Sequence, residues 1–380
     1  MRKTLLLTMD FPPEIGGVAN YWGNLLLNLP EDKVVVLAPE NDNSLDFDVK
    51  QKYVVYRRRL LTTSSRVWPR WWPYLWQVYR LCRVESPEQI IVGQVLPGGT
   101  IAWLMKKILN IPYILSFHGL DISMAQMTKR RKKWFRFLVN SASKIIVNSD
   151  FTKQKLILVM GTVKAPIEIV YPCASILPLN EYSDLILNDF VDRYSVKNKK
   201  IILSVGRLVE RKGFDQMIRV VSNIRRKMPF IHYFIVGRGP DKNRLESIVV
   251  HHNAEKYVTI LSDVSDDELP YFYKLADLFV MLPRELADGD VEGFGIVFLE
   301  ANLFHLPVLA GNSGGVPEAV ENNVSGVLVD SSDIMQIQQA AESLLKNDEN
   351  RRLMGDLGFE RAQRLYNWPA QAKRLEAFLG

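Results

Sequence analysis

The stretch that decides the fold of this 380-residue chain joins the apolar run Asp277-Leu-Phe-Val-Met-Leu-Pro283 to Glu292-Gly-Phe-Gly-Ile-Val-Phe-Leu-Glu300. A short apolar run that ends at a proline predicts a buried parallel strand. After it, Gly293 and Gly295 allow the backbone to approach a ligand closely. A helix that begins near Ile296 offers unpaired backbone amides to an anion. The stretch therefore predicts a strand, a ligand-binding turn and a helix.

The two glutamates of this stretch are suited to different parts of one ligand. Glu300 lies one turn inside the expected helix, about 6 Å along its axis from Ile296. That distance suits a nucleotide whose phosphate caps the helix while its ribose hydroxyls meet the carboxylate. Glu292, in the loop, can accept hydrogen bonds from a second polyol, such as a sugar. The alternative is two solvated glutamates around an ordinary strand-to-helix turn.

Apolar strands alternate with helix-length segments along the whole chain, which predicts an α/β architecture with parallel sheets. The first half has expected strands near residues 3–9, 33–38, 53–57, 89–92, 112–117, 144–148 and 168–171. The pattern restarts with expected strands near residues 200–205, 232–236, 257–261, 277–282, 306–310 and 326–329. Two tandem doubly wound domains would each bind ligands at the carboxyl ends of their strands. If those edges face each other, the cleft between them is the expected active site.

The length of the chain favours two domains. We expect an N-terminal domain over residues 1–180, a C-terminal domain over residues 181–360 and a C-terminal helix over residues 361–380. The expected linker starts at Tyr171-Pro-Cys-Ala-Ser-Ile-Leu-Pro-Leu-Asn180 and continues as a polar stretch that ends in Val196-Lys-Asn-Lys-Lys200. Trp368 and Pro369 mark a break in the final amphipathic segment.

Composition argues against several classes of protein. Hydrophobic residues at 47% and charged residues at 24% are ordinary values for a folded soluble protein. The two cysteines, Cys82 and Cys173, argue against a disulfide framework and against a cysteine-based metal site. The apolar run after Met1 is short and ends at Asp10, so it predicts a first strand and not a signal peptide. No segment has the apolar length to span a bilayer, and we expect an intracellular protein.

The net charge of +6 is unevenly distributed. Residues 1–180 hold 24 Lys and Arg against 13 Asp and Glu, a balance of +11, and the remaining residues hold 24 against 29, a balance of −5. This asymmetry suggests that the N-terminal half faces something anionic, either nucleic acid or a membrane surface.

Two further loops of the second half carry residues suited to a charged ligand. Val205-Gly-Arg-Leu-Val-Glu-Arg-Lys-Gly213 places Gly206, Arg207 and Lys212 at the carboxyl end of an expected strand. A guanidinium and an ammonium suit a diphosphate that gains charge as a leaving group. Asn312-Ser-Gly-Gly-Val-Pro-Glu318 repeats the arrangement of glycines followed by a helix. The alternatives are a solvated basic loop and a plain tight turn.

The first half places polar residues after two of its expected strands. Asp10-Phe-Pro-Pro-Glu-Ile-Gly-Gly17 follows the first strand, and Ser116-Phe-His-Gly-Leu-Asp121 follows a later one. His118 and Asp121 therefore lie at the edge where a ligand is expected. A lone histidine is more often structural than catalytic, but this one ends a buried strand and adjoins a glycine.

Together these motifs resemble the large family of retaining nucleotide-sugar glycosyltransferases of family 4, which have the GT-B fold. The features that match are spread through the chain: Gly16 and Gly17, His118, Gly206-Arg207 with Lys212-Gly213, Glu292 with Glu300, Gly314-Gly315 with Pro317-Glu318, and Trp368-Pro-Ala-Gln-Ala372. The segment from Asp290 to Ala301 is similar to bacterial mannosyltransferases of phosphatidylinositol mannoside synthesis. The resemblance implies two Rossmann-like domains and a C-terminal helix that crosses back to the first.

The resemblance also implies roles for single residues. Glu300 would bind the donor ribose, and Glu292 the hydroxyls of the transferred sugar. Arg207 and Lys212 would hold the diphosphate, and His118 would contact the donor sugar near the reacting carbon. The catalytic set would be Glu292, His118, Arg207 and Lys212, and further nucleotide-sugar contacts would come from Gly16, Gly17, Gly206, Gly293, Phe294, Gly295 and Ile296.

The implied activity is retaining transfer of a hexose, mannose or glucose, from GDP-mannose or UDP-glucose to a glycan or lipid-linked acceptor. Such chemistry leaves the protein mainly with positioning and electrostatic stabilisation. Alternatives are a nucleotide-sugar epimerase of the same fold and an inactive partner of another transferase. A nicotinamide dehydrogenase is disfavoured because Gly237-Arg-Gly239-Pro-Asp-Lys242 lacks the third glycine of the dinucleotide fingerprint.

Asp288-Gly-Asp290 matches a short acidic motif that another glycosyltransferase fold uses to hold a divalent metal. No other cluster of hard ligands accompanies it. We expect this segment to be a solvated loop, and we expect that the enzyme needs neither a metal nor a cofactor.

Two basic segments rich in aromatic residues suggest where an acceptor or a membrane binds. Arg57 to Arg59 lead into Arg66-Val-Trp-Pro-Arg-Trp-Trp-Pro-Tyr-Leu-Trp-Gln-Val-Tyr-Arg80, and Lys129-Arg-Arg-Lys-Lys-Trp-Phe-Arg-Phe-Leu138 predicts a basic helix. Such helices suit the headgroup boundary of an anionic membrane. No nucleic-acid fold signature accompanies them, and core tryptophans with scattered cations are the alternative. We expect an acceptor or membrane surface that includes Asp121, Trp71, Trp72, Arg130, Arg131 and Lys132, at the inner face of the cell membrane. This amphipathic face would also include Trp68, Trp76, Arg57 to Arg59 and Lys129 to Lys133.

Overall fold

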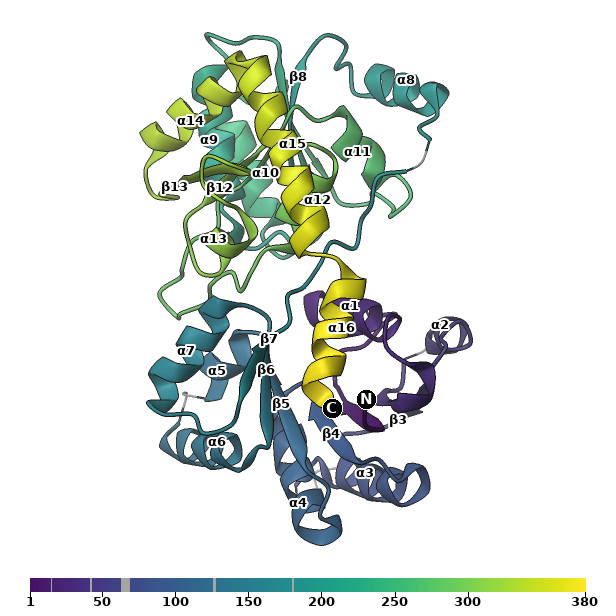
Figure 1. Cartoon of the computed structure of the whole chain (residues 1–380). Helices are drawn as coiled ribbons and strands as arrows, with labels where there is room; N and C mark the ends of the chain where they lie inside the picture. The colour runs from purple at the N-terminus through teal and green to yellow at the C-terminus, as the bar shows by residue number, and fades with distance from the viewer. Residues whose placement is uncertain (15, 42, 63–68, 126–127, 180) are drawn as a thin grey trace. The chain divides into compact units, whose positions relative to one another are not determined.

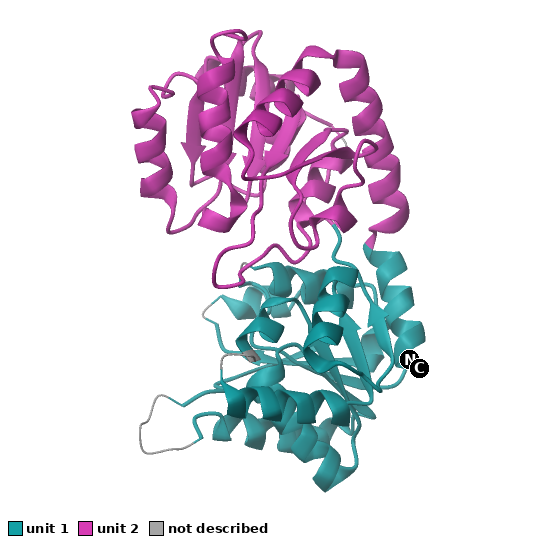
Figure 2. Ribbon diagram, turned by 90° about the vertical axis from the view of Figure 1, so that its left-hand side faces the viewer, with its two compact units in different colours: residues 1–173, 368–380 teal, residues 174–367 magenta. Residues whose placement is uncertain are grey.

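The computed structural model describes residues 1–14, 16–41, 43–62, 69–125, 128–179 and 181–380. The chain divides into two compact units (Figure 2). Unit 1 comprises residues 1–173 and 368–380, and unit 2 comprises residues 174–367. Each unit is built around one parallel sheet with helices on its faces, as the alternation of strands and helices predicts.

Unit 1 contains a parallel sheet in the order β3-β2-β1-β4-β5-β6-β7 (Figure 1). Its strands are β1 (Thr4–Leu7), β2 (Val34–Pro39), β3 (Val54–Arg58), β4 (Gln89–Val92), β5 (Tyr113–Phe117), β6 (Lys144–Val147) and β7 (Ile167–Ile169). Its helices are α1 (Gly17–Leu26), α2 (Ser44–Asp48), α3 (Trp72–Glu85), α4 (Thr100–Leu109), α5 (Leu120–Ala125), α6 (Lys129–Ser141), α7 (Asp150–Met160) and α16 (Trp368–Leu379), with short turns at Glu31–Lys33 and Val95–Gly99.

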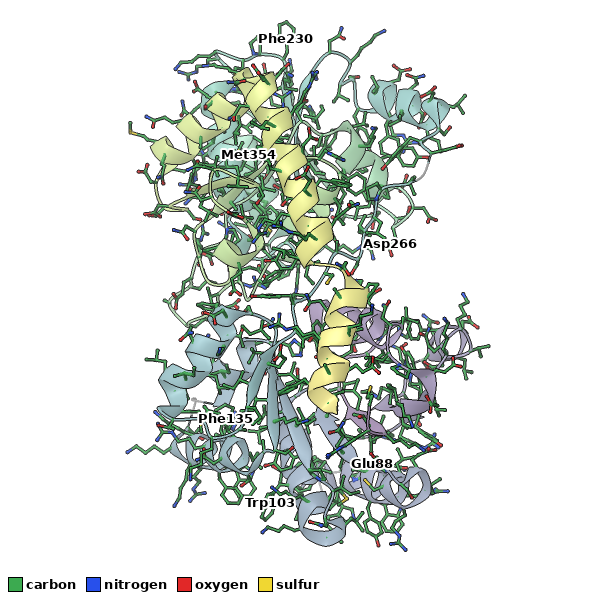
Figure 3. The ribbon with its side chains drawn as sticks, viewed as in Figure 1. Glu88, Trp103, Phe135, Phe230, Asp266 and Met354 are labelled. Atoms are coloured by element: carbon green, nitrogen blue, oxygen red, sulfur yellow. The ribbon has the colours of Figure 1, made fainter. Side chains whose placement is uncertain are left out.

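The two faces of this sheet carry separate apolar cores. Helices α3 to α7 pack on one face, where Phe135 of α6 is fully buried (Figure 3). Helices α1 and α16 pack on the other face, where Trp22 and Leu375 join the core. A sheet covered on both faces explains why its inner strands are mostly apolar and do not alternate with polar residues, unlike the edge strands β3 and β7.

Unit 2 contains a parallel sheet in the order β10-β9-β8-β11-β12-β13. Its strands are β8 (Lys200–Val205), β9 (Ile231–Val236), β10 (Val258–Leu261), β11 (Leu278–Met281), β12 (Val308–Gly311) and β13 (Gly326–Val329). Its helices are α8 (Asp184–Arg193), α9 (Phe214–Ile224), α10 (Lys242–His251), α11 (Leu269–Leu275), α12 (Ile296–Leu303), α13 (Val316–Ala319), α14 (Ile334–Lys346) and α15 (Asp348–Leu365), with a single turn at Glu210–Lys212.

Every strand expected from the sequence is present, with bounds that differ by a few residues at most. The helix expected near Ile296 begins there, and the basic helix expected from Lys129 is α6. Among the residues that the structure describes, no helix combines the length and the apolar character needed to cross a bilayer.

The boundary between the units lies before the expected position at residue 180. The amide of Tyr171 donates to Gln371 of α16 at 2.9 Å, which ties it to unit 1, whereas the amides of Ser175 and Ile176 donate to Glu300 of unit 2. The expected linker also contains a helix, α8, whose Phe190 packs edge-on against Phe272 of α11 at 5.0 Å. Asn180 lies outside the described residues.

The C-terminal helix begins at Trp368 and not at residue 361. Helix α15 continues to Leu365, and Arg361 donates to the backbone oxygens of Glu318 and Ala319 in unit 2. The chain breaks at Tyr366 and Asn367, and α16 then belongs to unit 1. These contacts explain why the residues before Trp368 belong to unit 2.

The loop after β8 is fastened to the end of β11 at a glycine. Gly213 has a φ of +71°, and a Cβ atom there would lie 2.0 Å from the carbonyl oxygen of Leu282. The amide of Leu282 in turn donates to the carbonyl of Lys212 at 3.2 Å. This close backbone contact places Lys212 beside the strand that leads to Glu292.

We therefore predict that Gly213→Ala lowers the free energy of unfolding of unit 2 by about 2 kcal/mol or more, because the new methyl group meets a backbone carbonyl. Gly289→Ala is the matched control: its φ is also positive, at +81°, but no heavy atom lies within 4 Å of the new Cβ. Thermal and urea unfolding measure both variants. Equal losses of stability would contradict a role for the contact with Leu282.

Candidate functional site

Two of the residues singled out in the second half of the sequence, Lys212 and Glu292, meet at the topological switch point of the unit 2 sheet. The strand order reverses between β8 and β11, and ligands bind at the carboxyl ends of strands beside such a reversal. The loop after β8 carries Lys212, and the loop after β11 carries Glu292. The strand order therefore brings both residues to the same edge of the sheet, as the sequence predicts.

Glu292 is a buried carboxylate that binds two cations. Its Oε2 atom lies 2.5 Å from Nζ of Lys212 and 2.6 Å from Nη1 of Arg211. Arg211 also pairs through Nε with Asp290 at 3.1 Å. Both cations bind the same oxygen of Glu292, and within the described parts of the chain Oε1 has no hydrogen-bond partner. One oxygen is therefore available to a ligand hydroxyl.

The charge of Glu292 is set by these cations. Burial alone would raise the pKa of its carboxyl group, but the charges of Lys212 and Arg211, and hydrogen bonds from both, lower it to about 2. Glu292 is therefore ionised near pH 7. A carboxylate held in this state accepts hydrogen bonds and donates none.

A third loop, after β12, packs against the backbone on either side of Glu292. A Cβ at Gly314 would lie 2.1 Å from the carbonyl oxygen of Glu292, and one at Gly315 would lie 2.1 Å from that of Gly293. The amide of Gly315 donates to the carbonyl of Glu292 at 2.9 Å. The two glycines at 314 and 315 thus have a structural reason: they let the loops after β11 and β12 touch.

Gly295 begins helix α12 with a φ of +93°, a conformation that favours glycine. A Cβ there would lie 2.6 Å from the ring of Phe298 in the first turn of the helix. Phe294 is buried, with its ring 5.5 Å from that of Tyr366, and Ile296 is half-buried. The turn that the sequence predicts as ligand-binding is therefore also a tightly packed turn.

Glu300 lies one turn inside α12 and is 6% exposed. Its Oε1 accepts the backbone amides of Ser175 and Ile176 at 3.2 and 3.3 Å, and its Oε2 accepts the hydroxyl of Tyr273 at 3.1 Å. Burial raises the pKa of this carboxyl group, and the three hydrogen bonds oppose that rise. Glu300 and Glu292 are therefore held by opposite means, by neutral donors and by cations.

Arg207 follows Gly206 in the loop after β8 and is exposed. No ion pair or hydrogen bond of its side chain is found among the residues that the structure describes. Gly206 has a φ of +156°, and the next turn of the loop is closed by the amide of Leu208, which donates to the carbonyl of Arg238 at 2.8 Å. The structure thus joins Lys212 directly to Glu292, whereas the guanidinium of Arg207 has no partner among the described residues.

In unit 1, His118 follows β5 and is enclosed by aromatic rings. Its ring lies 5.1 Å from that of Tyr21 and 6.2 Å from that of Trp22, and Nε2 lies 3.2 Å from the hydroxyl of Ser116. Burial lowers the pKa of His118 to about 4, so the imidazole is neutral near pH 7. The side chain can exchange hydrogen bonds with a ligand but supplies no positive charge.

Asp121 lies in the first turn of α5 and accepts the backbone amide of His118 at 3.2 Å. Burial raises the pKa of Asp121 to about 6, against the effect of this amide and of Lys155. Asp121 therefore shapes the turn that holds His118, a local role that the sequence does not reveal.

Gly16 and Gly17 stand at the amino end of α1. Gly16 has an extended backbone that any residue can adopt, and a Cβ at either position would meet no heavy atom of the described residues within 4 Å. Neither glycine is therefore explained by packing within unit 1. Open space above a helix amino terminus is a suitable place for an anion.

The predicted acceptor surface is only partly assembled as expected. Trp72 of α3 is 57% exposed, and Arg130, Arg131 and Lys132 of α6 are exposed, but Trp71 packs partly against the core. Arg57 does not belong to such a surface, because it pairs with Asp48 at 2.8 Å and is 10% exposed. Trp68 lies outside the described residues.

The expectation of a solvated acidic loop is wrong for Asp290. Its carboxylate pairs with Arg211, while Asp288 accepts the amide of Asp290 at 3.0 Å. Among the described residues, no group of three or more histidine, cysteine, aspartate or glutamate side chains could hold a metal ion. The acidic motif thus has a local structural role in joining two loops.

Two residues of this site were missed from the sequence. Arg211 lies next to Lys212 in the loop after β8, and its positive charge could have marked it as a candidate. Tyr273 lies in α11, and nothing local in the sequence marks it, because its link to Glu300 depends on the packing of α11 against α12. The contact is visible only in three dimensions.

Comparison with known proteins places both units in one class. Residues 15–175 match the model of "Glycosyltransferase Family 4", and residues 188–361 match that of "Glycosyl transferases group 1". The chain is similar to the GDP-mannose-dependent alpha-(1-6)-phosphatidylinositol monomannoside mannosyltransferase of Mycobacterium tuberculosis, with 29% identity over 100% of this chain and 98% of that protein. It is 25% identical to the GDP-mannose-dependent monoacylated alpha-(1-6)-phosphatidylinositol monomannoside mannosyltransferase of Corynebacterium glutamicum, over 100% of this chain and 98% of that protein.

Solved structures share the fold. The Anabaena protein HepE in complex with UDP-glucose superposes with a TM-score of 0.80 and 17% identity, over 100% of this chain and 99% of that one. A sucrose-phosphate synthase of Thermosynechococcus elongatus superposes with a TM-score of 0.80 and 19% identity, over 100% and 98%. The chain therefore belongs to the glycosyltransferases of family 4 with the GT-B fold, and its activity is that of a hexosyltransferase.

Proposed function

We propose that this hexosyltransferase transfers mannose from GDP-mannose, with retention of anomeric configuration, to an inositol-containing or other lipid-linked acceptor. The observation that carries the proposal is the free oxygen of Glu292, which is held ionised by Lys212 and Arg211 and can accept a hydroxyl of the donor sugar. Relatives that align over the whole chain, and whose names include GDP-mannose and phosphatidylinositol monomannoside, support the choice of donor and acceptor. The alternatives of an epimerase and of an inactive partner are not favoured by the family match.

The proposed chemistry relies on positive charge beside the leaving group. The bond between the anomeric carbon and the β-phosphate oxygen breaks, and the acceptor hydroxyl bonds to the same face of that carbon. The proton of the acceptor passes to the departing phosphate oxygen, so charge develops on the diphosphate. Lys212 and Arg207 would stabilise that charge, and the amides at the start of α12 would add to it.

We further propose that no metal ion and no cofactor is needed. Three cationic side chains, Arg207, Arg211 and Lys212, stand in one loop and outnumber the two carboxylates paired with them, Glu292 and Asp290. The remaining positive charge would do what a divalent ion does in other folds. Asp290 is already paired with Arg211 and is a poor candidate for a metal ligand.

For unit 1, we propose that Gly16 and Gly17 let a phosphate group approach the amino end of α1, since no described neighbour within 4 Å requires glycine there. His118, neutral and enclosed by Tyr21 and Trp22, would contact a sugar hydroxyl. The burial of its ring keeps the imidazole from attracting anions and suits it to a neutral polyol.

We also propose that unit 1 acts in the cytoplasm at an anionic membrane surface through helices α3 and α6. Helix α4 packs against both, and the described part of α6 carries five consecutive exposed cations, Lys129 to Lys133. Trp72, Trp76 and Phe137 are exposed at 57%, 59% and 41%. Lys129, Lys132, Lys133 and Arg136 line a shallow hollow that would accept an anionic headgroup. No nucleic-acid partner is proposed, because exposed aromatic residues beside cations suit a lipid interface.

Removal of the two glutamates should separate binding from turnover. We predict that Glu300→Ala weakens binding of GDP about ten-fold or more, because a charged hydrogen-bond acceptor for the ribose is lost. Glu292→Gln should weaken GDP binding less than Glu300→Ala does and lower kcat roughly a hundred-fold, because the charge that holds Lys212 and Arg211 and strengthens the hydrogen bond to the sugar is lost. Calorimetry and initial rates measure both, with the exposed Glu285→Gln as control. Wild-type binding and turnover in both variants would refute the assignment.

The source of positive charge can be tested directly. We predict that Arg207→Ala and Lys212→Ala each lower kcat/KM by a factor that corresponds to about 2–4 kcal/mol, whereas EDTA leaves the wild type fully active. The exposed Lys227→Ala serves as the control for loss of a lysine. Loss of activity in EDTA, restored by manganese, would instead assign the leaving-group charge to a metal.

Membrane binding is predicted to depend on α6. Wild type should sediment with vesicles that contain anionic lipid, and less so as salt is added, since each cation near the leaflet contributes about 1 kcal/mol. Arg130→Gln/Arg131→Gln/Lys132→Gln should sediment far less than Arg219→Gln/Arg226→Gln/Lys256→Gln, which removes three exposed cations of unit 2. Equal sedimentation of the two triple variants would contradict a specific role for α6.

A further inference from the structure

We infer that Tyr273 is a positioning residue of the donor site, whose hydroxyl orients the carboxylate of Glu300 toward the ribose of the nucleotide. The inference rests on the proposed role of Glu300 as the ribose contact. It adds a residue from α11, a helix that no motif connects with the nucleotide. The contact that carries it is the hydrogen bond from the Tyr273 hydroxyl to Oε2 of Glu300, at 3.1 Å and fully buried.

Glu300 depends on this hydroxyl because no cation supports it. No described ion pair includes Glu300, in contrast to Glu292 with its two cations. Its Oε1 is taken by the backbone amides of Ser175 and Ile176, which leaves Tyr273 as the side-chain donor to Oε2. A buried carboxylate without a counter-ion is costly unless its hydrogen bonds are good. Oε2, with one donor bound, is the oxygen that keeps acceptor capacity for a ribose hydroxyl.

The ring of Tyr273 is held rigidly, which makes the hydroxyl a precise support. It stacks on Phe304 at the end of α12, with ring centroids 4.9 Å apart, and on Phe279 of β11, with centroids 6.0 Å apart. Burial raises the pKa of Tyr273 well above its ordinary value, so the hydroxyl keeps its proton and remains a donor. The same two stacking partners would hold a phenylalanine ring in place of the tyrosine.

The charges around Glu300 make the contact sensitive to pH. Burial raises the pKa of Glu300, the amides of Ile176 and Ser175 and the hydroxyl of Tyr273 lower it, and Asp266, an exposed residue just before α11 that is labelled in Figure 3, raises it by a smaller amount. Removal of the Tyr273 hydroxyl therefore raises the pKa of Glu300 further. The ribose is bound by the ionised form of Glu300. As the pH is lowered, Tyr273→Phe should therefore lose nucleotide affinity at a higher pH than the wild type does.

The test is Tyr273→Phe, measured by calorimetric titration of GDP, UDP and 2′,3′-dideoxy-GDP across a pH series. We expect affinity for GDP to fall about ten-fold, KM for the donor to rise in parallel, and kcat at saturating donor to stay near wild type. The acid midpoint of GDP affinity should move to higher pH. Affinity for dideoxy-GDP, which lacks the ribose hydroxyls, should not fall. Tyr233→Phe is the matched control, because it removes another fully buried hydroxyl of unit 2, which lies 2.7 Å from Ser204.

The outcomes separate this inference from the proposed function. If Glu300→Ala leaves GDP affinity unchanged, the ribose assignment itself fails. If Glu300→Ala weakens GDP binding but Tyr273→Phe does not, only the role of Tyr273 is overturned. If Tyr273→Phe lowers the affinity for GDP and for dideoxy-GDP by the same factor, Tyr273 does not act through the ribose contact. If it lowers GDP affinity by the same factor in the Glu300→Ala background as in the wild type, it does not act through Glu300. A loss for GDP that disappears in the Glu300→Ala background supports the inference.

Discussion

A buried carboxylate between two cations is the interaction on which the rest of unit 2 depends. Removing three charged groups from water is unfavourable unless they are paired and hydrogen-bonded. The pairing of Glu292 with Lys212 and Arg211 therefore forces the loops after β8 and β11 to meet. The loop after β12 can then approach only because Gly314 and Gly315 present no side chain to the same backbone. Three loops from three strands are thus held in one place before any ligand arrives, which is the preorganisation that electrostatic catalysis requires.

The two glutamates that define the family motif are chemically different residues in this fold. Glu292 is kept ionised by neighbouring charge, and its pKa is lowered. Glu300 is kept in place by amides and a phenol, and its pKa is raised. The same side chain thus serves once as part of a charged cluster and once as an acceptor of hydrogen bonds from neutral groups. The difference comes from their partners, and those partners lie far away along the chain.

Strand positions could be predicted from the sequence, because the strands of a sheet with helices on both faces are apolar runs and such runs are local signals. The loops that follow the strands, and the motifs in them, could be placed as a result. The placement of Lys212 with Glu292 also followed, since both come after strands that adjoin the switch point. Three contacts could not be predicted: the pairing of Asp290 with Arg211, the hydrogen bond from the Tyr273 hydroxyl to Glu300, and the packing of Trp71 against the core. Each depends on which side chain of a distant helix or loop reaches the position, and spacing along the chain does not encode that. The first boundary between the units was placed too late because residues 174–179 join unit 2 through contacts such as those of the Ser175 and Ile176 amides with Glu300, a partner far along the chain.

The return of α16 to unit 1 has a consequence for how the protein is made. Unit 2 is one continuous segment and is complete once residue 367 has left the ribosome, whereas unit 1 still lacks Ala372, Leu375 and Leu379 of its second core. The domain that is synthesised first is thus the one that finishes folding last. Until α16 docks, the face of the sheet covered by α1 remains partly open, and its apolar residues are exposed to water.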